Sequence, residues 1–351
     1  MIINKDKPVL VTGATGYVAG WIIKKLFENN IPVHAGVRDL KNNEKLKWLN
    51  QLADKYNGKI TYFDTNLLKE NSYLKAMEDC ELVYHTASPF INKVSNPMKD
   101  LIEPALLGTR NVLSSVNQTD SVKRVVLTSS IAAIVGDTKD LLGLPDGTCN
   151  ESHLNTTSSQ THQPYSFSKK IAEEEAWRIN SLQNRWDLVV VNPALVLGPG
   201  INPNSTSESL RILKQIADGT MKMGAPNLSL SLVDVRDVAD AHFNAGFTPK
   251  ANGRHIISQG RKTLLEIADI LREKYGNDYN FPTRNLPKWL IWLLAPTIGL
   301  ARKMVSKNIG YPWKSNNQKS IEKLGIAYRP IEETILEHFQ QMIDFNIIKR
   351  P

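Results

Sequence analysis

Residues 9–20 read VLVTGATGYVAG, and their pattern predicts how the chain begins to fold. The apolar run Val9–Thr12 predicts a buried strand, and the spacing of apolar residues in Tyr17–Glu28 predicts a helix. Gly13 permits a tight turn between the two elements, and Gly16 lets the backbone approach a pyrophosphate over the helix N-terminus. The succession of strand, glycine turn and helix predicts a dinucleotide site; the alternative is a glycine-rich turn in an unrelated α/β protein.

Apolar runs and helical patterns go on alternating through the first two-thirds of the chain. The runs are short, rich in Val and Ile and nearly unbroken, which is typical of parallel strands covered on both faces. The pattern predicts an α/β fold, a doubly wound parallel sheet (Rossmann) with a smaller, mostly helical C-terminal substrate domain. The predicted strands are residues 9–12, 33–37, 60–63, 82–85, 125–128 and 188–191, and the predicted helices are 17–28, 98–116 and 167–181.

The alternation of predicted strands and helices ends after Pro193, where a loop rich in Gly, Pro, Ser and Asn follows. A return to the first domain is expected further along the chain. We expect residues 1–193, with about 230–257, to form the dinucleotide-binding domain. Residues 194–229 and 258–351 are then the substrate-binding domain.

The composition is that of a globular protein with a basic balance. The 351 residues carry a formal charge of +8, which suits an anionic ligand or serves solubility. Basic patches with interleaved aromatic residues are not found, so no nucleic-acid partner is expected. Cys80 and Cys149 lie at no metal-ligand or redox spacing, which favours a reduced, cytoplasmic compartment and predicts no metal site. The N-terminus runs straight into a strand, so no signal peptide is expected.

The longest apolar run is WLIWLLAPTIGLA, residues 289–301. Its 13 residues are interrupted by Pro296 and are too few to cross about 30 Å of hydrocarbon, so no membrane span is expected. The run predicts a buried wall or lid. Shallow docking into a membrane surface is the alternative.

Tyr165 and Lys169 lie four residues apart in the stretch YSFSK. On a helix this spacing places both side chains on one face. An ammonium beside a phenol favours the phenolate, as a tyrosine that exchanges protons with a substrate requires. The alternative is a solvated pair on an exposed helix. Ser129 and Ser130 follow the strand predicted at 125–128, where one hydroxyl can donate to a substrate carbonyl oxygen.

The end of the second strand bears on the choice of cofactor. Arg38 is placed to contact a 2′-phosphate, and Lys45 could help, which favours NADP(H). A shift of one residue would present the Asp39 carboxylate to a ribose hydroxyl instead, so NAD(H) stays possible.

The chain resembles the extended short-chain dehydrogenases/reductases of the NAD-dependent epimerase/dehydratase superfamily. Within them it is most similar to the dihydroflavonol reductase/cinnamoyl-CoA reductase group and its bacterial aldehyde-reductase relatives. The motifs that carry the resemblance cover nearly the whole chain in the family's order: VTGATGYVAG, VRD, HTASP, GTRNVL, LTSS, YSFSK and NPALVLGP.

The resemblance implies roles for individual residues. Ser130 would polarise the carbonyl, Tyr165 would be the acid/base, and Lys169 would assist Tyr165 and hold the nicotinamide ribose. Asn66 stands where the family has Asp at the adenine. The expected cofactor-binding residues are Thr12, Gly13, Thr15, Gly16, Tyr17, Val18, Arg38, Lys45, Asn66, Leu67, Thr86, Ala87, Ser88, Thr128, Tyr165, Lys169, Pro193 and Val196.

The expected substrate pocket consists of Ser88, Phe90, Ile131, Val135 and Leu195. Val135 stands where the plant flavonoid enzymes carry an asparagine, which argues against a flavonoid substrate. The sequence thus predicts an NADPH-dependent reductase for aldehydes or ketones with an apolar body, acting as a monomer or homodimer. One alternative is an NAD-dependent sugar-nucleotide epimerase or dehydratase; another is a non-catalytic nicotinamide-sensing regulator.

Overall fold

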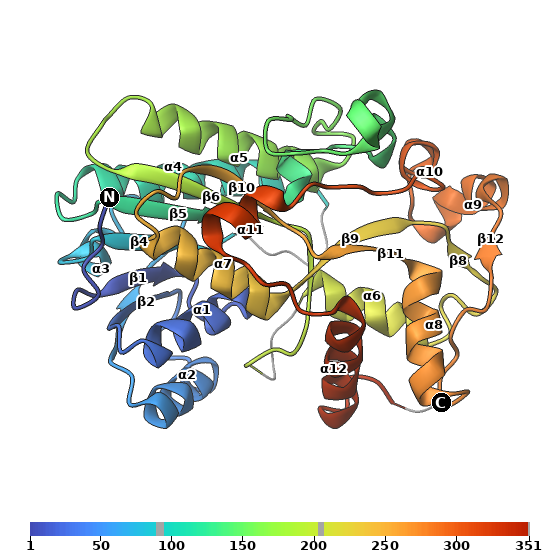
Figure 1. Cartoon of the computed structure of the whole chain (residues 1–351), viewed down its shortest axis with the longest axis horizontal. Coiled ribbons are helices and arrows are strands. Elements are labelled where there is room, and N and C mark those ends of the chain that lie inside the picture. Colours follow the sequence, from blue (N-terminus) through green and yellow to red (C-terminus); the bar gives the residue numbers. More distant parts are fainter. Residues whose placement is uncertain (89–94, 203–206, 350–351) are drawn as a thin grey trace.

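The computed structural model describes residues 1–88, 95–202 and 207–349, without the side chains of Asn43 and Lys45. In the described part of the chain the main sheet has seven strands in the order β10-β6-β5-β4-β1-β2-β3, all parallel (Figure 1). This order is that of a doubly wound sheet, so the predicted fold class is confirmed. The strands are β1 Val9–Thr12, β2 Val33–Val37, β3 Ile60–Asp64, β4 Leu82–His85, β5 Arg124–Thr128, β6 Asp187–Pro193 and β10 Gly253–Ile257.

Helices cover both faces of this sheet because alternate strand residues point to opposite sides. Val9 and Val11 of β1 pack in one core with α1 (Tyr17–Glu28), α2 (Asn43–Tyr56) and α7 (Val235–Phe247). Leu10, between them, packs in a second core on the other face. That second core is built with α3 (Leu74–Met77), α4 (Glu103–Asn117) and α5 (Pro164–Asn180).

Two predicted helices differ from the structure at their N-terminal ends. The helix expected at 98–116 starts as a single π turn, η1 (Met98–Ile102), before α4 continues. The helix expected at 167–181 begins earlier, at Pro164, because proline at the first helical position loses no hydrogen bond that the helix needs. Tyr165 therefore lies in the first turn of α5.

The C-terminal region holds smaller sheets and further helices around a separate core. β9 (Ser229–Asp234) pairs here with β7 and β11, so the first residues of the return expected at 230–257 lie in this smaller sheet. α7 and β10 rejoin the main sheet, and α11 packs against both of them; the domain boundaries stay a prediction. The remaining elements are β7 Leu195–Leu197, α6 Glu208–Ala217, β8 Ala225–Pro226, β11 Gly260–Thr263, α8 Leu264–Tyr275, β12 Asn285–Leu286, α9 Lys288–Leu294, α10 Arg302–Asn308, α11 Gln318–Leu324 and α12 Ile331–Asp344.

The apolar run 289–301 forms α9 and a short 3-10 helix, η5 (Ala295–Ile298). Ile291 and Ala295 are buried, but Trp289 and Ile298 are more than half exposed. The expectation of a buried wall is therefore wrong for most of this segment. Among the residues described, no helix is long and apolar enough to cross a membrane.

Candidate active site

The glycine turn after β1 lies close to the backbone of the segment after β4, at the carboxyl edge of the sheet. Gly13 has a φ of 62°, and a Cβ there would lie 3.0 Å from the Cα of Ala87. The N–H of Gly16 donates to the carbonyl of Gly13 at 2.9 Å and closes the turn. The first N–H groups of α1, from Tyr17 onward, point out of the helix end without partners inside the helix. Such a helix end suits the phosphates of a dinucleotide.

Thr12 ties the glycine turn to the segment after β4. Its hydroxyl lies 3.1 Å from Nδ1 of His85 and accepts from the N–H of Ala87 at 3.0 Å. The hydroxyl of Thr86 donates to the Thr12 carbonyl at 2.5 Å. Burial, with a smaller effect from Lys169, lowers the pKa of His85 to about 3, so its ring is neutral. These bonds place the expected cofactor residues Thr86 and Ala87 beside Gly13.

The side chain of Tyr17 points away from the turn. Its hydroxyl donates to the carbonyl of Gly198 at 2.5 Å, and its ring stacks on His338. Burial, reinforced by the Asp234 carboxylate, raises the pKa of Tyr17 well above its ordinary value. The tyrosine hydroxyl thus joins α1 to the loop after β7, and a cofactor can meet only the Tyr17 backbone. Thr15 lies in the turn itself.

The ends of β2 and β3 carry the residues expected around the adenosine. Arg38 follows β2 directly and is exposed. The Asp39 carboxylate accepts from the N–H of Lys41 at 2.9 Å and so forms part of the local turn. Asn66 follows β3, and its Oδ1 accepts from the N–H of Leu68 at 2.9 Å. One lone pair of that oxygen stays available to a ligand. The expected contacts of the Lys45 side chain and of Phe90 lie outside the described residues.

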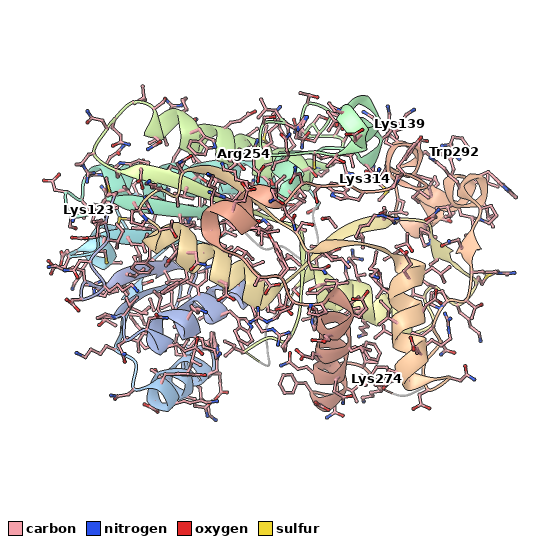
Figure 2. The ribbon with its side chains drawn as sticks, in the orientation of Figure 1. Lys123, Lys139, Arg254, Lys274, Trp292 and Lys314 are labelled. Carbon is pink, nitrogen blue, oxygen red and sulfur yellow. The ribbon has the colours of Figure 1, made fainter. Side chains whose placement is uncertain are left out.

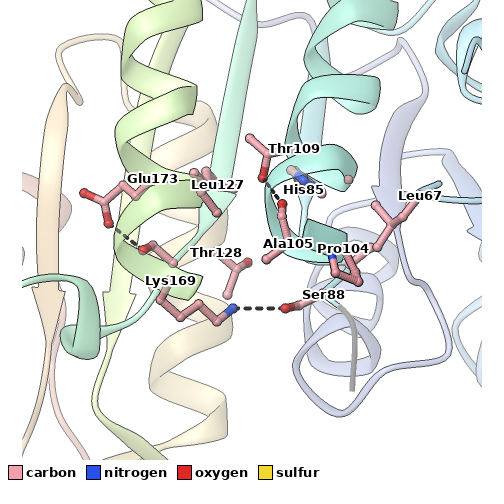
Figure 3. A pocket seen from close by; sticks show the side chains of 14 residues that line it. Leu67, His85, Ser88, Pro104, Ala105, Thr109, Leu127, Thr128, Lys169 and Glu173 are labelled. Carbon is pink, nitrogen blue, oxygen red and sulfur yellow. Dashed lines mark hydrogen bonds between the residues drawn. The ribbon is translucent and has the colours of Figure 1, made fainter. Parts of the chain in front are cut away.

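The predicted pair on α5 faces the end of β4. Nζ of Lys169 donates to Oγ of Ser88 at 3.2 Å (Figure 3). The same Nζ lies 5.8 Å from the ring centroid of Tyr165. Tyr165 is 52% exposed, so its hydroxyl is accessible to a small molecule. Ser130 caps the 3-10 helix η2 (Ile131–Ala133), and its Oγ accepts from the N–H of Ala132 at 3.1 Å. Because Ser130 accepts in this bond, its own proton can be donated. Among the described residues no hydrogen bond joins Tyr165 to Ser130.

A buried carboxylate, that of Glu173, binds one of the two serines that follow β5 and not the other. The hydroxyl of Ser129 donates to Oε2 of Glu173 at 2.5 Å, and Nδ2 of Asn192 donates to the same oxygen at 2.7 Å. Arg254 forms an ion pair with Oε1 of Glu173, with Nε 2.6 Å away, and Glu173 is only 4% exposed. Nδ2 of Asn192 also donates to the Ser130 carbonyl at 3.1 Å. Ser129 is therefore held in the core, and Ser130 is the serine left for a ligand.

Thr128 is oriented by a histidine that the sequence did not indicate. Nδ1 of His242 lies 2.7 Å from the carbonyl of Val238 and must donate to it. Burial lowers the pKa of His242 to about 4, so Nε2 carries no proton and accepts from Thr128 at 2.7 Å. The hydroxyl of Thr128 thus points its proton inward and keeps acceptor capacity toward the site.

A pocket lies at the carboxyl ends of β4 and β5, between α4 and α5, and of the residues described above it is lined by His85, Ala87, Ser88, Thr128, Ser129, Lys169 and Glu173 (Figure 3). Ligands of doubly wound sheets bind at this edge. Several expected cofactor residues line the pocket: Leu67, Ala87, Ser88, Thr128 and Lys169. Of the others, Pro193 ends β6, and Val196 lies in β7 of the smaller sheet, next to the expected substrate-pocket residue Leu195.

Two residues of the expected substrate pocket are buried in a small apolar cluster. Ile131 and Val135 pack there with Leu141, and Trp313 of the C-terminal region covers them. The cluster brings η2 and the C-terminal region into contact beside Ser130. Whether Ile131 and Val135 touch a substrate stays a prediction.

Comparison with known proteins places the chain among reductases. The model of the NAD dependent epimerase/dehydratase family matches residues 9–257. The chain belongs to this family. It is 34% identical to cinnamoyl-CoA reductase CAD2 of Medicago truncatula over 341 residues, which cover 97% of this chain and 96% of that protein. It is 33% identical to anthocyanidin reductase of Arabidopsis thaliana over 281 residues, or 77% and 81% of the two chains.

A solved structure agrees with this placement in the NAD dependent epimerase/dehydratase family. Yeast methylglyoxal/isovaleraldehyde reductase Gre2, complexed with NADPH, superposes with a TM-score of 0.73 at 27% identity. The match covers 97% of this chain and 99% of the yeast chain. The predicted family and the predicted class, an NAD(P)-dependent oxidoreductase, are thus confirmed. The roles of Ser130, Tyr165 and Lys169 and the individual cofactor contacts stay predictions.

Proposed function

We propose that this protein is an NADPH-dependent reductase that transfers hydride to the carbonyl carbon of an aldehyde or ketone with an apolar body. One observation carries the proposal: Lys169 lies between Tyr165 and Ser88, on the sheet edge that also holds the glycine turn. Carbonyl reduction needs a bound dinucleotide as hydride donor and a proton donor beside it. Here the glycine turn can bind the dinucleotide, and the accessible phenol next to an ammonium can donate the proton. The relatives and the structural neighbour named above are themselves called reductases.

The residues on this edge fit a dinucleotide. A side chain at Gly13 would collide with Ala87, so glycine is what keeps this turn tight against the segment after β4. The N-terminus of α1 offers N–H groups to the pyrophosphate, and exposed Arg38 offers a cation to a 2′-phosphate. Asp39, held in its own turn, competes little for the ribose. These features favour NADP(H) over NAD(H). When bound, the dinucleotide supplies the hydride.

The protein's own residues then manage the charge that develops on the substrate oxygen. Ser130 donates a hydrogen bond to the carbonyl oxygen and stabilises the growing alkoxide. Tyr165 delivers the proton to that oxygen, and the nearby Lys169 ammonium stabilises the phenolate that Tyr165 leaves behind. Ser88 holds Lys169 in place through its hydroxyl. Asn192 and Glu173 fix the strand end on which Ser130 sits.

The surroundings favour a substrate with an apolar body. Ile131, Val135 and Leu195, the described residues of the expected pocket besides Ser88, have no polar side-chain atoms with which to select a hydroxylated ring. A sugar nucleotide would need several basic residues for its diphosphate. Cys80 and Cys149 are both free and buried, and burial raises the pKa of each thiol to about 12. Neither thiol is poised for redox chemistry, and a reduced, cytoplasmic location stays part of the proposal.

The test of the proposed function is the initial rate of NADPH oxidation with a panel of aldehydes, α-diketones and β-keto esters. Each substrate is also assayed with NADH. We expect turnover on at least one apolar carbonyl compound, faster with NADPH. Purified protein that already carries tightly bound NAD and turns over only sugar nucleotides would point to an epimerase or dehydratase. Saturable NADPH binding without turnover on any substrate would favour a regulator.

Replacing Arg38 by Ser should weaken NADPH binding and leave NADH binding nearly unchanged. A hydrogen bond to a charged group contributes about 1.5–3 kcal/mol, which corresponds to about 10–150-fold in the dissociation constant for NADPH. The measurement is a fluorescence titration of each variant with both cofactors. Lys41→Ser is the matched control, because it removes a neighbouring exposed cation from the same turn. Equal losses for NADPH and NADH, or equal losses in the two variants, would contradict a 2′-phosphate contact of Arg38.

A further inference from the structure

Residues 279–321 form a strongly basic segment. The segment contains seven basic residues and no Asp or Glu. The whole chain has 43 basic and 35 acidic residues, so this segment supplies nearly all of the net charge of +8. Its part with α9 and α10 lies at one end of the long axis of the molecule, whereas its last residues enter α11 beside β10 (Figure 1).

At this end of the molecule some large apolar side chains are buried in a small cluster, and others are exposed to solvent. Ile291, Ala295, Val305 and Ile309 form a small separate cluster between α9 and α10. The rest of α9 is turned outward: Trp289 is 68% exposed and Leu293 54%. Residues three and four apart share a face of a helix, so Trp289, Trp292 and Leu293 lie together. With the exposed Ile298 of η5 they form a surface that we call the tryptophan patch.

Cations lie next to the tryptophan patch. The guanidinium of Arg302 stacks over the ring of Trp292, 4.4 Å from its centroid. Figure 2 shows Trp292 at the same end of the molecule as α9 and α10. Nζ of Lys288 lies 4.3 Å from the ring centroid of Tyr311 and donates to the carbonyl of Ser306. We call the cations around the patch the basic rim: Arg284, Lys288, Arg302, Lys303 and Lys307. In the part of the chain that the structure describes, none of them takes part in an ion pair.

We propose that the tryptophan patch and the basic rim dock this protein on the surface of an anionic phospholipid bilayer. Trp side chains favour the boundary between headgroups and acyl chains, and apolar residues beside them bury into it. Arg and Lys extend their charged ends to lipid phosphates while their stems lie along apolar surface. Each cation near an anionic leaflet contributes to binding, and the segment itself carries no carboxylate to oppose this. The segment is too short to span the bilayer, so docking is peripheral.

Other occupants fit the same surface less well. In a symmetric dimer through this patch each basic rim would face its like-charged copy, since a two-fold interface pairs identical surfaces. A nucleic acid would use the cations but leave Trp289, Leu293 and Ile298 facing water. Only a partner that is apolar in its interior and anionic at its surface matches both features. Docking is independent of the proposed reductase activity, and its test needs no turnover.

The experiment is flotation of the full-length protein with phospholipid vesicles. One set contains phosphatidylcholine alone, and the other contains about 30% phosphatidylserine to provide an anionic surface. We expect the protein to float with the anionic vesicles and to stay behind with the neutral ones. Raising the salt from about 0.1 M to about 1 M shortens the screening length from about 10 Å to about 3 Å and should release most of it.

Two double variants separate the two parts of the surface. Trp289→Ser/Trp292→Ser keeps the charge, and Arg302→Glu/Lys303→Glu keeps the patch; each should lower the partition coefficient about tenfold or more. Lys59→Glu/Lys250→Glu is the matched control, because it changes the net charge equally at exposed residues that precede β3 and β10, at the amino ends of the main-sheet strands. It should bind like the wild type. Unchanged circular dichroism and melting temperature establish that the variants fold.

The proposal fails on any of three results. The first is no flotation with anionic vesicles at low salt. The second is an equal loss of binding in the control pair, which would mean attraction by net charge alone. The third is a concentration-dependent dimer that the tryptophan variant abolishes, because a second copy would then cover the patch.

Discussion

Replacing Tyr165 by Phe is expected to lower kcat by about 10²–10⁴. The reason is that Phe removes only the hydroxyl that delivers the proton. The ring, whose centroid lies 5.8 Å from Nζ of Lys169, is kept. Because Tyr165 is 52% exposed, the substitution opens no cavity, and stability and NADPH affinity should stay near those of the wild type. The measurement pairs initial rates of NADPH oxidation with a fluorescence titration of NADPH.

Tyr62→Phe is the control for loss of a tyrosine hydroxyl. Tyr62 lies on β3 at the edge of the sheet, and its hydroxyl donates to Oδ1 of Asn50 on α2 at 2.7 Å. That bond is remote from the pocket, so turnover should be unchanged. A Tyr165→Phe variant that keeps wild-type turnover would remove Tyr165 from the proton transfer. Loss of NADPH binding in that variant would assign Tyr165 to cofactor binding instead.

The main sheet could be predicted from the sequence because its strands are buried on both faces. The bounds of β1, β2 and β4 agree with the prediction, since proline, glycine or polar residues flank each apolar run. β5 and β6 both begin one residue earlier than predicted, at Arg124 and Asp187. In a sequence pattern, a charged residue next to an apolar run is taken to lie outside the buried strand. Here the two charges neutralise each other across neighbouring strands, which a reading of one strand at a time cannot detect.

The candidate site was predictable only where its geometry is local. Tyr165 and Lys169 are four residues apart on one helix, so spacing alone places them on one face. Besides Trp177 on the same helix, the partners of Glu173 are Ser129 after β5, Asn192 on β6 and Arg254 on β10, which are far apart in the sequence. Nothing in the stretch around Glu173 marks it as buried. The distinction between Ser129 and Ser130 follows from those contacts and therefore needed the structure.

Replacing Asp187 by Ala is expected to lower the free energy of unfolding by about 3 kcal/mol. The guanidinium of Arg124 is fully buried and binds both oxygens of Asp187, at 2.7 and 2.8 Å. Removing one partner of a buried pair costs about 3–5 kcal/mol, because the other charge stays buried without compensation. We expect the lower end, since the Asp187 side chain is 38% exposed. Arg124 would keep only carbonyl acceptors, those of Ala245, Gly246, Thr248 and Pro249.

Urea unfolding measures this loss through the midpoint at an unchanged slope. Glu28→Ala is the control, because its pair with Lys24 is exposed to water and should contribute about 0.5 kcal/mol or less. The Arg124–Asp187 pair lies at the amino ends of β5 and β6, whereas the pocket lies at the carboxyl ends. Turnover per folded molecule should therefore be unchanged in Asp187→Ala. A loss of turnover without a loss of stability would contradict this separation, because it would mean that the pair positions the residues at the opposite edge.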